Sequence, residues 1–134
     1  MTQEDKELLL KDLCARLPYG VKCYDEVQRE VGVFKHFEYD GFGRIHNGRG
    51  VRFIENIKPY LFPMSSMTDE QNDSWRDAWF PDLMSSTDIN YPESEKYLAL
   101  SHYKSMDWLY KHHFDVNGLI EKGLAIDATD KNIY

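Results

Sequence analysis

The sequence predicts an α+β fold in which a short antiparallel sheet, formed by about residues 20–54, packs against an N-terminal helix and two or three C-terminal helices. Leucines with helical spacing open the chain, β-branched and aromatic residues between turn signals follow, and a helix-capping pattern starts at Thr68. The length of 134 residues and the hydrophobic content of 42% suit one core. We therefore expect a single domain over 1–134, with a polar tail from about residue 127 that frays.

The N-terminal segment predicts a helix over residues 3–16. Thr2 is a suitable N-cap, and Glu4 and Asp5 place negative charge in the first turn, where the helix dipole favours it. Pro18 ends the helix because it disfavours helical geometry at the preceding residue and has no amide hydrogen. The spacing predicts a buried face made of Leu9, Leu10, Leu13, Cys14 and Leu17.

The next segment predicts the sheet. Residues 21–24 form one expected strand and residues 31–39 a second, because β-branched and aromatic residues dominate both. Asn47-Gly48 lies between 44–46 and 49–53 and is a strong hairpin signal, since both of its residues tolerate positive φ.

The second half predicts mainly helix. Pro59 and Pro63 interrupt the apolar residues before them, so we expect an irregular segment or a single turn there. Thr68 and Gln71 form a capping box that starts a helix, and Pro81 is expected to end it. We then expect a loop over 81–93 and a helix over 94–114, with an extended stretch at 97–100 as the alternative for its first part. A short helix over 118–122 and an extended segment over 124–126 are expected to follow.

Charge and composition restrict the class of protein. The net charge is −7, with eight basic against nine acidic residues in 1–50 and eight against fourteen in 51–134. Because nucleic-acid-binding proteins usually carry a basic surface, this balance argues against duplex binding by most of the surface. No long apolar stretch or signal-peptide core is present. We expect a cytoplasmic protein with no membrane partner, either a monomer or a small homo-oligomer, whose Cys14 and Cys23 are reduced thiols.

Three blocks of the sequence resemble one family. They are KELLLKDLCARLPYGVK at 6–22, IKPYLFPMSSMT at 57–68 and HFDVNGLIEKGLA at 113–125. The family consists of small proteins of gut anaerobic bacteria and of their prophage-like or mobile elements. The resemblance implies a cytoplasmic bacterial or phage protein. It carries over no catalytic residue, because no activity is assigned to that family.

A histidine-rich group consists of His112, His113 and Asp115 at the end of the predicted 94–114 helix and of His102, ten residues before His112. Adjacent residues of a helix point about 100° apart, so His112 and His113 cannot form the i, i+4 pair of a helical zinc site. We interpret the two histidines as helix C-terminal residues that suit the dipole, and Asp115 as a cap for the next turn. We predict no metal and no cofactor.

Local signatures of catalysis are absent from the sequence. It contains no GxSxG, and Gly41-Phe-Gly43 does not complete a phosphate-binding loop. We lean against an enzyme. A site assembled from distant residues, such as Cys23 with a histidine brought near by folding, stays open as the third hypothesis.

Two candidate binding surfaces remain. The glycine-rich hairpin at 41–53 places basic residues between aromatic ones, a pattern that suits single-stranded nucleic acid. Its candidate contacts are Phe42, Arg44, His46, Arg49, Arg52 and Phe53. The second half holds more aromatic residues than a small core needs, which favours a protein-binding face. Its candidates are Trp75, Trp79, Tyr103 and Trp108. Protein binding is the first hypothesis and nucleic-acid contact the alternative.

Overall fold

The computed structural model describes the backbone of residues 1–37, 44–47, 51–84 and 102–134, and the side chains of 1–35, 53–79 and 102–134. Its strands are β1 (Lys22–Asp25), β2 (Glu30–Phe37), β3 (Arg44–Asn47), β4 (Val51–Phe53), β5 (Ile57–Leu61) and β6 (Ile126–Asp127). Its helices are α1 (Gln3–Arg16), α2 (Asp69–Met84) and a helix over 102–111, with short 3-10 turns at Leu17–Tyr19, Ile54–Asn56 and Met64–Ser66.

The strands form one six-stranded sheet in the order β4-β3-β2-β1-β5-β6. Neighbouring strands are antiparallel except β5 and β6, which pair in parallel. The predicted α+β class, with an antiparallel sheet at 20–54 and the N-terminal helix, is confirmed. The sheet also extends beyond this prediction, because β5 and β6 join it from outside the 20–54 segment.

The irregular segment predicted around Pro59 is wrong, because β5 passes through this residue as a strand between β1 and β6. The amide of Glu26 donates to the carbonyl of Asn56 at 2.9 Å, which fixes the alternation of hydrogen-bonded pairs along the β1–β5 ladder. By that alternation Pro59, opposite Cys23, falls on a pair that exchanges no hydrogen bonds. The missing amide hydrogen of proline therefore costs this ladder nothing.

The predicted bounds of α1 are confirmed, but its predicted buried face is partly wrong. The Thr2 side chain accepts a hydrogen bond from the amide of Asp5 at 3.1 Å, as expected of an N-cap. The buried residues of α1 are Leu9, Asp12, Leu13 and Arg16, whereas Cys14 and Leu17 are exposed. A charged pair thus occupies the face that the leucine spacing had assigned to Cys14 and Leu17.

The capping box of α2 is confirmed in both directions. The amide of Gln71 donates to the Thr68 hydroxyl at 3.1 Å, and the amide of Thr68 donates to the Gln71 side-chain oxygen at 2.9 Å. The predicted end at Pro81 is wrong, since α2 continues to Met84. Of the predicted loop over 81–93, residues 85–93 lie outside the described residues, as does the first part of the predicted 94–114 helix.

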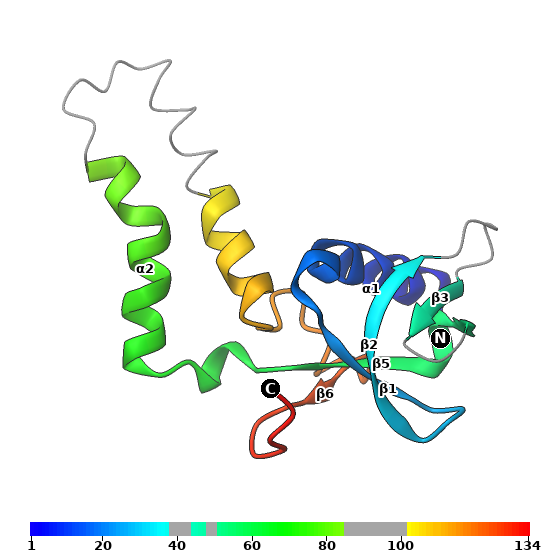
Figure 1. Ribbon diagram of the computed structural model, residues 1–134. Coiled ribbons are helices and arrows are strands. Elements are labelled where there is room, and N and C mark those ends of the chain that lie inside the picture. Colours follow the sequence, from blue (N-terminus) through cyan, green and yellow to red (C-terminus); the bar gives the residue numbers. More distant parts are fainter. Residues whose placement is uncertain (38–43, 48–50, 85–101) are drawn as a thin grey trace.

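The helix α2 and the helix over 102–111 form a helical arm. Figure 1 shows that the two helices are antiparallel and that both project from the sheet: α2 leads away from it and the helix over 102–111 leads back. The Trp75 indole connects them, because its Nε1 donates to the carbonyl of Ser105 at 3.2 Å and to its hydroxyl at 3.0 Å. Along α2 the Trp75 and Trp79 rings meet edge to face, with centroids 6.3 Å apart.

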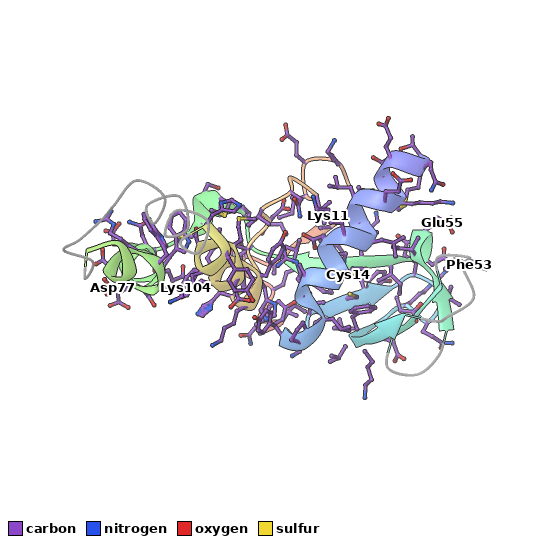
Figure 2. The ribbon with its side chains drawn as sticks, turned by 90° about the horizontal axis from the view of Figure 1, so that it is seen from above. Lys11, Cys14, Phe53, Glu55, Asp77 and Lys104 are labelled. Atoms are coloured by element: carbon purple, nitrogen blue, oxygen red, sulfur yellow. The ribbon has the colours of Figure 1, made fainter. Side chains whose placement is uncertain are left out.

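The core lies between α1 and the sheet, and Figure 2 shows α1 crossing the strands. Its buried apolar residues come from α1, the strands, the residue before β1, the 3-10 turn after β4 and the segment before β6. They include Leu9, Leu13, Val21, Cys23, Phe34, Ile54, Ile57, Leu61, Leu119 and Leu124. The predicted short helix over 118–122 is instead a series of turns. Asp115 caps it as predicted, accepting from the amides of Leu119 and Ile120 at 2.8 and 3.0 Å.

The C-terminal tail, expected to fray, instead packs on the sheet. The Tyr134 hydroxyl accepts from the amide of Lys22 and donates to the carbonyl of Tyr60, each at 2.9 Å. Its ring stacks on His113 with centroids 3.9 Å apart. The tail is therefore held by its last residue.

Candidate partner-binding groove

The helix over 102–111 contacts four different parts of the molecule: α2, the core, Phe114 and α1. Ser105 faces α2, and Leu109 is buried toward the core. Trp108 stacks on Phe114, with ring centroids 5.9 Å apart. The remaining side faces α1 with residues at helical spacing, Tyr103, Met106, Asp107 and Tyr110.

A groove of about 300 Å³ separates this last side from the C-terminal end of α1. The opposite wall consists of Cys14 and Ala15 from α1 and of Pro18 and Tyr19 from the 3-10 turn that follows. Its lining is mostly apolar and aromatic, with three tyrosine side chains and one carboxylate. Its volume lies at the lower end of the range for ligand pockets, so the groove suits one side chain or a small molecule.

The carboxylate of Asp107 is tied to one wall of the groove. The Tyr19 hydroxyl donates a hydrogen bond to it. This hydrogen bond is the main reason that the pKa of Tyr19 is raised to about 12, with smaller contributions from burial and from the Asp107 and Tyr103 side chains. Tyr19 therefore stays protonated at neutral pH and remains a donor to Asp107.

A buried polar network lies on the core side of α1, next to the groove. Arg16 and Asp12 are both 0% exposed, and the Arg16 guanidinium donates to the two Asp12 oxygens at 2.7 and 3.1 Å. Arg16 also donates to the Phe114 carbonyl at 2.6 Å, and the Asn117 amide donates to Asp12 at 2.9 Å. The Tyr110 ring belongs to both features, because it lies 4.9 Å from the Arg16 guanidinium and also lines the groove.

The structure separates the four predicted protein-binding residues. Tyr103 is 67% exposed and lies at the groove. Trp75, Trp79 and Trp108 are half-buried and engaged in the contacts within the arm and with Phe114. Sequence reasoning missed Tyr19 and Asp107, because the groove joins segments almost ninety residues apart; the only local signal was the helical spacing of the 103–110 side chains.

The predicted hairpin strands are confirmed, since β3 pairs with β4 and β2 with β3. The backbone register places Arg44 opposite Phe53, Arg52 opposite Ile45, and His46 opposite Val51. Phe53 is 50% exposed. Phe42 and Arg49 lie outside the described residues, as does Tyr39 of the predicted second strand.

His112 and His113 lie as predicted at the end of a helix, in the turn that follows residue 111, whereas His102 is the first described residue of that helix. Burial, together with the Arg16, His112 and Lys22 charges, lowers the pKa of His113 to about 4, so this side chain is neutral at pH 7 and the predicted favourable charge at the helix end is wrong for it. Within the described part of the chain, no three His, Cys, Asp or Glu side chains are grouped as metal ligands would be. Cys23 is fully buried and burial raises its pKa, so its thiol has the character of a core residue and not of a nucleophile.

Compared with protein-family models, curated proteins and solved structures, the chain matches none. Among the residues that the structure describes, no helix combines the length and apolar character needed to cross a membrane.

Proposed function

We propose that this protein is a small cytoplasmic accessory protein of a bacterial mobile element that acts by binding another protein. The observation that carries the proposal is the groove at the base of the helical arm, with Tyr103 exposed at its side. The family resemblance of the segments 6–22, 57–68 and 113–125 supplies the bacterial setting. The segment 6–22 lines the groove, and the segment 113–125 contributes Phe114 and Asn117 to the buried polar network around Arg16.

Tyr103 distinguishes this surface from the rest of the aromatic residues. Large exposed aromatic side chains are typical anchors of protein interfaces, because a partner can bury them with little loss of conformational entropy. Because Tyr103 is 67% exposed, it contributes little to the core, whereas the tryptophans are held by contacts inside the molecule. The Tyr103 ring is therefore free to be buried by a partner protein.

The test is affinity purification of the tagged protein from its native host, with nuclease treatment and with two matched variants. Tyr103→Ala removes the exposed aromatic residue at the groove, and Phe53→Ala removes a similarly exposed one on the sheet. We expect a nuclease-insensitive partner that Tyr103→Ala loses and Phe53→Ala retains, while both variants keep the wild-type circular dichroism. Recovery that is equal for all three proteins would count against the groove, and repeated recovery of no protein would count against protein binding.

A second candidate function, contact with single-stranded nucleic acid, is favoured by the side of the sheet that carries Val31 and Val33. These two residues are 43% and 36% exposed. The register sets Lys22 opposite Val33, and Tyr24 between Val31 and Lys58. This side of the sheet thus combines basic residues with one aromatic ring, next to strands β3 and β4 whose sequences contain Arg44 and Arg52, and single-stranded nucleic acid binds to surfaces of this composition.

Gel retardation of labelled single-stranded DNA and RNA tests the second candidate. We expect retardation at low salt that weakens as salt increases and that is lost in the triple variant Arg44→Ser, Arg49→Ser, Arg52→Ser. A triple replacement of the α2 acids Asp69, Asp73 and Asp77 by Ser serves as the control for altered surface composition. If neither DNA nor RNA is retarded at low salt, the sheet is not a nucleic-acid-binding surface.

A further inference from the structure

Two carboxylates near the C-terminal end of α1 differ in how their charge is balanced. Asp12 is fully buried and receives two hydrogen bonds from Arg16 and one from Asn117. Asp107 is half-buried in the groove and receives a hydrogen bond from the neutral Tyr19 hydroxyl. Among the described residues, no lysine, arginine or histidine forms an ion pair with Asp107.

This imbalance has a chemical consequence for what the groove binds. A carboxylate in mostly apolar surroundings attracts a cation more strongly than one in water, because the local dielectric constant is lower. A carboxylate can accept about four hydrogen bonds, so Asp107 retains acceptor capacity beyond the bond from Tyr19. The groove therefore offers an uncompensated negative charge within reach of a ligand.

The tyrosine side chains around Asp107 favour the same class of ligand. Aromatic faces attract cations that lie within about 6 Å of the ring centroid, and guanidinium groups in particular stack on them. The molecule already contains one such contact, with the Arg16 guanidinium 4.9 Å from the Tyr110 ring. The charge of Arg16 is balanced by Asp12, so it leaves little positive potential to repel a second cation from the groove.

The net charge of the whole chain, and not the charge of the groove walls, adds long-range attraction for a basic partner. The chain has a net charge of −7. The exposed side of α2, the other helix of the arm, carries Asp69, Glu70, Asp73 and Asp77 against the single basic residue Arg76. A surface of this sign raises the association rate of a positively charged segment and makes the rate depend on salt.

We infer that the groove between α1 and the helix over 102–111 binds the guanidinium group of an arginine presented by a basic segment of the partner protein. The Asp107 carboxylate would accept its N–H groups while Tyr19 and Tyr103 contact its planar face. This inference rests on the proposed protein-binding function and specifies its chemistry. It selects arginine because the planar, permanently charged fork of this side chain suits a carboxylate beside aromatic rings.

The test uses the peptide acetyl-Gly-Gly-Arg-Gly-Gly-amide, titrated into the ¹⁵N-labelled full chain and followed by NMR. The matched control peptide has citrulline in place of arginine, which keeps the shape and removes the charge. We expect saturable shifts at Cys14, Tyr103 and Met106, with a Kd of about 1–10 mM for so small a ligand, and no saturation with the citrulline peptide. Cys14 gives a second readout, because its exposed thiol should be alkylated more slowly when the groove is occupied.

Two acid-to-amide variants identify the carboxylate. Asp107→Asn should raise the Kd at least about fivefold, whereas Asp77→Asn, which removes the same charge from the exposed side of α2, should leave it within about twofold. Equal binding of the citrulline peptide, equal binding by Asp107→Asn, or shifts confined to residues outside the groove would overturn the inference. If the arginine inference is overturned but Tyr103→Ala still loses the native partner in the affinity purification, the proposed protein-binding function stands. If the affinity purification recovers no partner, both the function and the inference fail.

Discussion

Replacing Arg16 by methionine should lower the free energy of unfolding by about 3–5 kcal/mol, the usual cost of leaving one member of a buried ion pair without its partner. Methionine fills most of the volume of the side chain but donates no hydrogen bond. Asp12 then loses two donors and keeps only the Asn117 amide, and the Phe114 carbonyl loses its 2.6 Å donor. Each buried acceptor left without a donor costs about 1–3 kcal/mol, which agrees with that total.

Urea denaturation followed by tryptophan fluorescence measures this loss. Lys6→Met is the matched control, because Lys6 and Glu55 form an ion pair at 2.5 Å whose side chains are 33% and 39% exposed. Its loss should cost less than about 1 kcal/mol. The double variant Asp12→Leu, Arg16→Met removes both charges and should recover most of the stability that Arg16→Met loses. If Arg16→Met costs no more than Lys6→Met, the buried network does not hold the fold together in the way that its geometry implies.

Three further predictions concern titratable side chains. Ellman's reagent should detect one thiol in the native protein and two in denaturant, since Cys14 is exposed and Cys23 is buried; two reactive thiols in the native state would contradict the packing of Cys23. In a spectrophotometric titration, Asp107→Asn should lower the pKa of Tyr19 from about 12 toward its ordinary value of 10, because the carboxylate that raises it is gone; an unchanged value would show that the two side chains do not interact. Wild-type stability should fall as the pH is lowered from 6.5 to about 4, because the His113 side chain takes up a proton in the unfolded chain before it does so in the fold. His113→Asn, which tolerates the left-handed φ of 64°, should flatten this part of the pH profile; an unaltered slope would assign it to other groups.

Features set by local chemistry could be predicted from the sequence. The start of α1 at Thr2 and the start of α2 at Thr68 depend on side chains that bond to amides three residues away. The pairing of β3 with β4 follows from a turn signal next to both strands. These interactions involve neighbours in the chain, so they leave a readable pattern in the sequence.

Features set by the environment of a residue could not be predicted in this way. Asp12 and Arg16 follow the pattern of solvated helix residues, and they are buried because they pair with each other and because Asn117 and the Phe114 carbonyl, about a hundred residues away, form further hydrogen bonds with them. Pro59 seemed to exclude a strand, yet the register with β1 places it where no amide hydrogen is needed.

The candidate site, too, could be predicted from the sequence only in part. Composition indicated an acidic protein with an excess of aromatic residues, and it suggested Tyr103 as one of four contacts. It did not distinguish that side chain from the tryptophans, because exposure depends on what packs against each ring. The sequence by itself thus determined the α+β class, the helix caps and the hairpin, whereas the tertiary structure decided which charges are buried and brought Tyr19 and Asp107 together in one groove.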